Sequence, residues 1–283
     1  MLTAVEVHSK VPFVPKLELP LIGNDGLGPF HIRHIEGLDP VKSTVNSRGY
    51  GALDGEYYTG SHVGKRNIVM TLGMNPSANY QSVSELRKLL YAYLMPKMNP
   101  ILKFVTNDRP LVQIEGYVES LEGDRFVKDP EIQVSVICPK PFFESAEVKT
   151  VGGAASNNPL DQTFVYDGDM TNGIVLQVFK GASAYTGPIT IEVGRVGPIY
   201  RKFETVSTVE AGRYFVLDSR QGIKRVESRS LPANLRVANL LGTITSDSLW
   251  PYLVLGTNKI RVKTNSGVQL PWILYFTERY GGL

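Results

Sequence analysis

The sequence predicts a mainly β protein with one α-helix and two domains. The 283 residues include 27 Gly and 18 Pro, more than the ~12% that is usual for these two residues together, which is typical of a chain with many turns. Apolar and polar residues alternate over many short runs, as they do in half-buried strands. At roughly 150 residues per domain, a chain of this length predicts two domains.

One segment has the sequence pattern of a helix. Ser82 and Glu85 have the spacing of a capping box, in which each side chain bonds the other residue's backbone amide. The residues that follow repeat at helical spacing and form one apolar stripe: Leu86, Leu89, Leu90, Tyr93 and Leu94. Pro96 cannot continue a helix. The pattern predicts a helix over residues 83–94, with one face packed on a sheet.

The rest of the first half is predicted to be strand and turn. Strands are expected at residues 65–72, 101–106, 112–118 and 131–137. The polar stretch from Gly49 to Gly64 has no apolar periodicity and predicts an extended arm or a hairpin. Pro139 and Pro141 lack the amide donors that a central strand needs. We therefore expect a domain boundary near residue 143, with domains 1–143 and 144–283.

The second half has strand patterns and no helix pattern. Strands are expected at residues 174–179, 189–193, 214–217, 258–262 and 269–277. Gly and Asn clusters predict turns between them at Gly187-Pro188, Gly256-Thr257-Asn258 and Asn265-Ser266-Gly267. Short strands separated by such turns are typical of a β-sandwich or a jelly roll.

The charges give no indication of a nucleic-acid partner. Thirty basic and 27 acidic residues give a net charge of +3, and the basic residues are scattered along the chain. No apolar run reaches the length of a transmembrane helix, so membrane insertion is not expected. Cys138 is the one cysteine, which excludes an intrachain disulfide and fits assembly in a reducing cytoplasm.

The sequence offers no catalytic constellation. Among the four histidines, His31 and His34 are three positions apart in a predicted strand, which places them on opposite faces. Neither a nucleophile elbow nor a zinc-protease motif occurs. We therefore predict no catalytic residues, no metal site and no cofactor, and do not expect an enzyme.

Two tryptophans in the second half have different surroundings. Trp272 lies in an apolar run and is predicted to be in the core. Trp250 and Tyr252 follow a polar run and could form an exposed platform on which a sugar stacks. The alternative is that they pack against the end of a sheet.

Several motifs, in this order and spacing, resemble the distal tail proteins of bacteriophages with long tails. In the first half they are Ile35-Glu-Gly-Leu-Asp-Pro-Val41, Gly64-Lys-Arg-Asn-Ile68, the helix at 83–94, Gln113-Ile-Glu-Gly-Tyr-Val-Glu119 and Pro130-Glu-Ile-Gln-Val-Ser-Val-Ile-Cys-Pro139. In the second half they are Leu240-Leu-Gly-Thr-Ile-Thr-Ser-Asp-Ser-Leu-Trp-Pro251, Leu255-Gly-Thr-Asn-Lys-Ile260 and Tyr275-Phe-Thr-Glu-Arg-Tyr-Gly-Gly282. The resemblance covers residues 20–283.

The resemblance implies a fold, an assembly and a location. The first domain would be a tail-tube-like β-sandwich or barrel with a flanking helix, and the second a galectin-like β-sandwich. Such proteins form a hexameric ring that ends the tail tube and joins it to the baseplate or tail tip. The implied partners are the tail tube protein, the tape measure protein, the baseplate hub or tail-fibre protein and the receptor-binding protein. The implied location is the virion, after assembly in the host's cytoplasm.

The polar arm is the segment that we expect to contact a neighbouring subunit of that ring. Its Tyr50, Tyr57 and Tyr58 would supply contact area with few rotatable bonds to order. Three other functions stay open: a glycan-binding baseplate module, a tail-tube subunit and a hydrolase. A bare tube subunit would not need the second domain, and a hydrolase would need a constellation that the sequence does not offer.

Overall fold

The chain forms two compact units built mainly from antiparallel strands. The computed structural model describes residues 1–10, 14–21, 28–51, 54–76, 82–123, 130–195, 201–265 and 267–283. The first unit consists of Met1–Glu147 and Tyr280–Leu283, and the second of Val148–Arg279. The predicted mainly β class is confirmed.

The first unit contains two sheets and a separate hairpin. The larger sheet has the strand order β2-β1-β7-β8-β11-β24, and the smaller one has the order β3-β6-β10-β9. Strands of the larger sheet are β1 (Leu2–His8), β2 (Leu17–Pro20), β7 (Ile101–Thr106), β8 (Val112–Glu115), β11 (Phe143–Ser145) and β24 (Arg279–Tyr280). Those of the smaller sheet are β3 (Phe30–Glu36), β6 (Arg66–Met74), β9 (Tyr117–Glu122) and β10 (Glu131–Cys138). The hairpin is formed by β4 (Ser43–Gly49) and β5 (Glu56–Val63).

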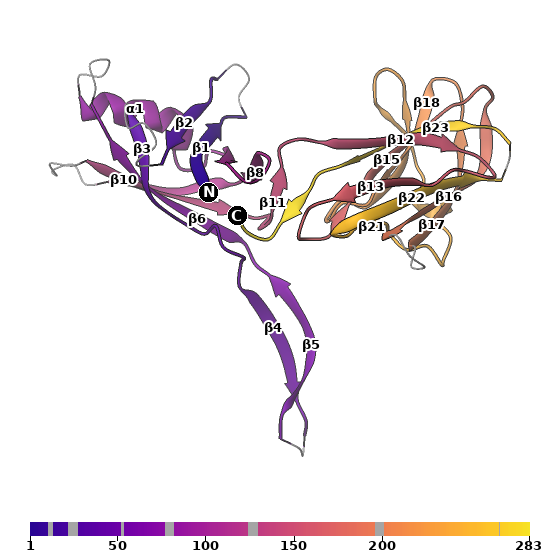
Figure 1. Cartoon of the computed structure of the whole chain (residues 1–283), viewed down its shortest axis with the longest axis horizontal. Coiled ribbons are helices and arrows are strands. Elements are labelled where there is room, and N and C mark those ends of the chain that lie inside the picture. Colours follow the sequence, from indigo (N-terminus) through magenta and orange to yellow (C-terminus); the bar gives the residue numbers. More distant parts are fainter. Residues whose placement is uncertain are drawn as a thin grey trace. The chain divides into compact units, whose positions relative to one another are not determined.

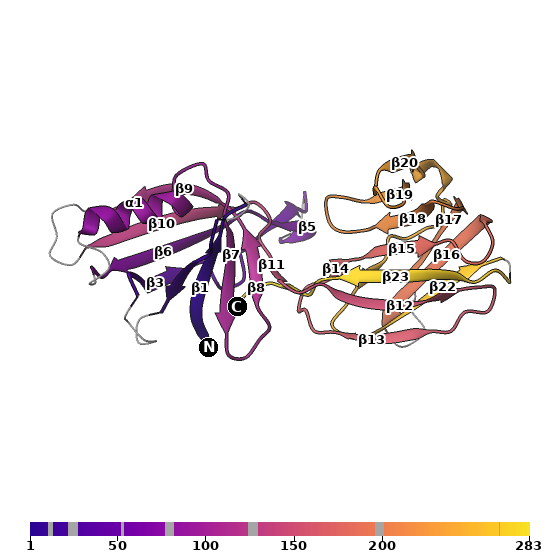
Figure 2. The same ribbon diagram turned by 90° about the horizontal axis from the view of Figure 1, so that it is seen from above.

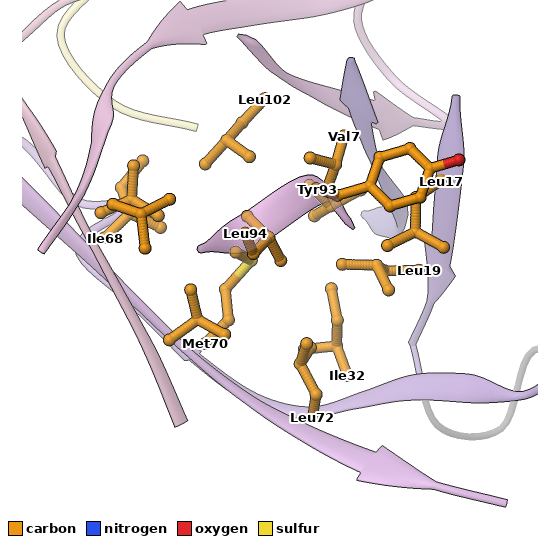
Figure 3. Packing of buried hydrophobic residues seen from close by; sticks show 14 of the residues in the cluster. Val7, Leu17, Leu19, Ile32, Ile68, Met70, Leu72, Tyr93, Leu94 and Leu102 are labelled. Carbon is orange, nitrogen blue, oxygen red and sulfur yellow. The ribbon is translucent and has the colours of Figure 1, made fainter. Parts of the chain in front are cut away.

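The predicted helix is confirmed as α1 (Val83–Leu94). The side chain of Ser82 accepts a hydrogen bond from the Glu85 amide at 3.3 Å, as the capping box requires. The apolar stripe of α1 faces the core of the first unit, where Tyr93 and Leu94 lie among side chains of both sheets (Figure 3). This burial fixes the helix because a segment of 12 residues has little helical stability alone.

The predicted strand at 112–118 is two strands in different sheets. The chain passes from β8 to β9 at Gly116, whose amide donates to the Pro100 carbonyl. A Cβ on Gly116 would lie 2.5 Å from a methyl group of Val136. A glycine is therefore needed where the backbone passes so close to β10. The apolar residues alternate on both sides of Gly116, so the sequence pattern does not show that one strand ends there and another begins.

The second unit contains two larger sheets and one short strand pair. Its six-stranded sheet has the order β12-β23-β15-β18-β19-β20, in which the strands lie side by side (Figure 2). These strands are β12 (Lys149–Ala155), β15 (Val175–Phe179), β18 (Arg213–Asp218), β19 (Arg225–Ser230), β20 (Arg236–Asn239) and β23 (Leu270–Phe276). The four-stranded sheet has the order β13-β22-β16-β17 and comprises β13 (Gln162–Tyr166), β16 (Tyr185–Arg195), β17 (Arg201–Val209) and β22 (Gly256–Thr264). The short pair is β14 (Asn172–Gly173) with β21 (Tyr252–Leu253), and a 3-10 turn follows β20 at Leu241–Thr243.

Two predicted turns of the second half are wrong. Gly187 and Pro188 lie within β16, where Pro188 is opposite Val206 of β17. Pairing of β16 with β22 begins only at Ile189, so the missing amide of Pro188 lies beyond the part of the strand that β22 joins. Gly256 begins β22 with a left-handed φ of +98°. Trp272, in contrast, is 2% exposed in the core as predicted.

Candidate functional site: an exposed β-hairpin

The hairpin β4–β5 extends away from the two sheets of the first unit (Figure 1). Its strands pair from Ser43 opposite Val63 to Gly49 opposite Glu56, and they form a two-stranded sheet of their own. Every residue of β4 is exposed. The predicted arm at 49–64 therefore contains the whole second strand, β5, of a hairpin whose first strand begins earlier, at Ser43.

The three tyrosines lie at the outer half of this hairpin. Tyr50 and Tyr57 contact each other across it, with ring centroids 5.5 Å apart. Tyr58 lies on the opposite face, since successive residues of a strand alternate, and its hydroxyl donates to Ser61 Oγ at 2.8 Å. The exposed fractions of Tyr50, Tyr57 and Tyr58 are 50%, 41% and 64%. The structure thus brings two of the three together and presents aromatic surface on both faces.

An isolated two-stranded hairpin is marginal in water. The hairpin has one polar cross-strand contact near its tip, from Ser47 to the Glu56 carboxylate. It has no buried apolar face among its described residues. Exposed aromatic side chains on such an element gain stability when a second surface covers them. The hairpin is therefore the candidate contact surface of the first unit.

The base of the hairpin is fixed by the buried side chain of Arg66. This residue begins β6, three positions after β5, and is 1% exposed. Its guanidinium donates to four carbonyl oxygens: Pro141 at 2.6 Å, Gly37 at 2.5 Å, Asp39 at 2.8 Å and Gly281 at 2.5 Å. It also lies 4.4 Å from the ring centroid of Phe143. Burial lowers the pKa of this guanidinium.

The close approach at this base requires a glycine at position 37. Gly37 has a left-handed φ of +85°, and a Cβ there would lie 2.0 Å from the Asn67 carbonyl oxygen. The segment entering the hairpin and the segment leaving it are thus held together by Gly37 and Arg66. Both residues belong to the motifs of the resemblance, but the sequence does not indicate that Arg66 is buried. No local pattern indicates that an arginine after a polar stretch will be buried.

Trp250 and Tyr252 lie in the second unit and are both partly buried. The indole of Trp250 packs on the buried ring of Phe203, with centroids 5.2 Å apart. The guanidinium of Arg201 covers the Tyr252 ring at 3.9 Å, and it donates to the Tyr252 hydroxyl at 2.7 Å. One ring is therefore in contact with the core, and the other is in contact with a cation.

The described part of the chain contains no group of three or more His, Cys, Asp or Glu side chains that could hold a metal ion. Cys138 is buried in the first unit. Burial raises the pKa of its thiol to about 12, although the nearby Arg66 acts in the opposite direction. A thiol in this state is a poor nucleophile. No helix in the described ranges is long and apolar enough to cross a membrane.

Comparisons with known proteins find a likeness in structure and none in sequence. No family model and no curated protein matches the chain. The crystal structure of the Dit (gp 19.1) protein of phage SPP1 matches with a TM-score of 0.62 and 11% identity, over 88% of this chain and 93% of that one. That protein is described as a paradigm of the hub adsorption apparatus in phages that infect Gram-positive bacteria.

A chain of the phage P2 baseplate in its activated conformation with Ca matches over 97% of this chain and 98% of that one. Its TM-score is 0.48 at 8% identity, which is too distant to support an argument. The match to the SPP1 protein covers most of both chains, so it includes both compact units. The chain therefore has the fold of the SPP1 Dit protein, as the resemblance of its sequence to distal tail proteins predicted.

Proposed function

We propose that this protein is a structural component of a phage virion that forms a hexameric ring at the distal end of the tail. The ring would join the tail tube to the baseplate or tail-tip hub and to receptor-binding parts. In this proposal residues 1–143 are a tail-tube-like, ring-forming domain and residues 144–283 are a galectin-like β-sandwich. The role is architectural, without catalysis or a cofactor.

The observation on which the proposal depends is the extent of the likeness to the SPP1 protein. That likeness covers 88% of this chain, so it includes the first unit, the second unit and their order. A tail-tube subunit, which would need only the first domain, is less well supported. The same breadth supports the proposed location in the virion. It also supports tail components as the proposed partners: the tube, tape measure, hub or fibre and receptor-binding proteins.

A ring of identical subunits needs one surface that contacts a different surface of the next subunit. The hairpin β4–β5 fits the first of these surfaces. It extends beyond the two larger sheets of the first unit (Figure 1) and carries the exposed Tyr50, Tyr57 and Tyr58. Tyrosine is among the residues that contribute most to protein interfaces. The hairpin would lie on the neighbouring subunit and bury its aromatic rings there.

The first experiment is the native mass of the purified protein by light scattering, followed by negative-stain imaging. Six chains of 31.3 kDa give about 188 kDa, and an open ring of that mass supports the proposal. The test is repeated with tail components present, because some rings close only during assembly. A protein that stays monomeric with those components present contradicts it.

Two variants test whether the hairpin is needed for ring formation. One lacks residues 51–62, and the other carries the two substitutions Tyr57→Ser and Tyr58→Ser. Both variants are expected to lose the ring while their circular dichroism stays that of the folded monomer, because the hairpin has no share in the core. The matched control is Tyr117→Ser in β9, which removes a tyrosine of similar exposure (46%) outside the hairpin. A ring that survives the deletion refutes the assignment.

A sugar platform at Trp250 and Tyr252 stays a prediction with a separate test. Glycan binding that disappears in Trp250→Ala, in a protein that still forms the ring, would support it. The contacts of Trp250 with Phe203 and of Tyr252 with Arg201 favour a packing role. If Trp250 and Tyr252 only pack in this way, we expect a glycan array to show no binding that depends on these two side chains.

A further inference from the structure

The strand β20 (Arg236–Asn239) forms an open edge of the second unit's six-stranded sheet. On one side it pairs with β19, and on the other side no described strand joins it. The amide of Leu240 donates to the Val226 carbonyl of β19. Because backbone groups alternate sides along a regular strand, the amide of Asn239, between Ala238 and Leu240, points away from β19. It offers an unpaired backbone group to another chain.

Exposed apolar side chains lie within β20 and on both sides of it in the sequence. Leu231, Leu235, Val237 and Leu241 are exposed to 49%, 66%, 43% and 41% respectively. Four large apolar side chains within 11 consecutive positions differ from the isolated exposed apolar residues that any surface has.

The same region is strongly basic. Residues 213–236 contain six basic residues and two acidic ones, a net charge of +4 in a chain whose total is +3. Both acids are buried and paired: Asp218 with Arg220 and Arg225, and Glu227 with Arg229. The charge that remains at the surface is therefore positive, and Arg236 within β20 is exposed.

One edge of the four-stranded sheet is covered, unlike β20. That edge is strand β17, and the segment that follows the 3-10 turn lies along it. Thr245 donates its amide to the Glu204 carbonyl, and Leu249 donates to that of Lys202. Thr205 also forms a bridge with Ile244. The chain thus covers β17 with its own backbone and leaves β20 open a few residues earlier.

We propose that β20 is a docking edge for an extended, acidic segment of another virion protein. The segment would add a strand beside β20, with a backbone hydrogen bond from the amide of Asn239. Its apolar side chains would cover Leu235 and Val237, and its carboxylates would lie near Arg236. The identity of the partner as a virion protein rests on the proposed function, whereas binding at the edge requires no ring.

The test uses the full chain and two synthetic octapeptides, one alternating valine with glutamate and one alternating valine with lysine. Binding is measured by calorimetry, and amide exchange is followed by NMR. The glutamate peptide is expected to bind about tenfold or more tightly than the lysine peptide. It should slow exchange at the Asn239 amide and leave that of Leu240 unchanged, because Leu240 is already bonded to β19.

Two variants locate the site. Val237→Ser should weaken binding of the glutamate peptide about tenfold, whereas Val165→Ser, at an exposed valine of the edge strand β13, should have no effect. Arg236→Glu should reverse the preference between the peptides. Equal affinity for both peptides, protection elsewhere, or no binding overturns the proposal and leaves β20 as an edge protected by its shortness. Light scattering on the same samples reports the ring separately, so failure of one proposal does not count against the other.

Discussion

Arg66 donates a hydrogen bond from Nη2 to the carbonyl oxygen of Gly281 at 2.5 Å, joining positions 215 residues apart. Leu283 adds a second link by donating its amide to the Leu38 carbonyl. The C-terminal residues therefore pack beside the segment that leads into the hairpin. The end of the chain and the base of the candidate contact surface share one buried side chain.

Arg66→Met should destabilise the first unit by about 3–5 kcal/mol, because it leaves buried carbonyl oxygens without a donor. Both tryptophans belong to the second unit, so tryptophan fluorescence reports that unit during urea unfolding. We expect the circular dichroism transition to move to lower urea more than the fluorescence transition. Arg109→Ala, which removes an exposed donor to Gly282, is the control and should change little. Equal midpoints in the Arg66→Met variant and the parent would contradict this account.

Gly153→Ala should destabilise the second unit by about 1–3 kcal/mol, the usual cost of overpacking a core. A Cβ at Gly153 would lie 2.6 Å from the indole of Trp272, which leaves no room for a methyl group. The neighbouring Gly152→Ala is the matched control, because its nearest contact would be an ordinary 3.5 Å. Unfolding followed by tryptophan fluorescence measures both. Similar midpoints for the two variants would show that the Trp272 ring shifts without cost.

Asp161 should stabilise the second unit at neutral pH, and this contribution should be lost in acid. Hydrogen bonds from Arg261 and the nearby Lys259 lower the pKa of its carboxyl to about 2, against a smaller opposing effect of burial. A carboxyl with a lowered pKa in the folded state stabilises that state above the unfolded pKa of about 4. This stability is lost as the pH falls from about 4 to about 2. Urea midpoints by tryptophan fluorescence should fall less steeply over this window in Asp161→Asn than in the parent, and identical slopes would exclude the contribution.

Cys138 should react with iodoacetamide only when the first unit opens. Its thiol is fully buried, and burial raises its pKa to about 12, so little thiolate exists at pH 8. Mass spectrometry should find one modified cysteine in urea and none in native buffer over the same time. Arg66→Met should accelerate the native reaction, because it raises the population of the open first unit. Rapid labelling of the native parent would contradict the buried assignment.

The sequence by itself determined the elements whose signals are local. The helix α1 begins and ends where its cap and its prolines placed it, because both signals act within one turn. Strand β7 matches residues 101–106, since alternation over a few residues reflects one buried face. The polar stretch without apolar periodicity predicted an extended arm or a hairpin, and the structure has a hairpin there. The core position of Trp272 followed from the apolar run that contains it.

Tertiary structure decided everything that depends on partners far away in the chain. Gly116 interrupts a continuous strand pattern only because β10 passes close to it. Gly187 and Pro188 stay in β16 because β22 begins to pair one residue later. Arg66 is buried because four carbonyl oxygens from three distant segments converge on it. Such contacts join residues that no short window of sequence contains, so only the folded chain shows where the hairpin is anchored and which edge stays open.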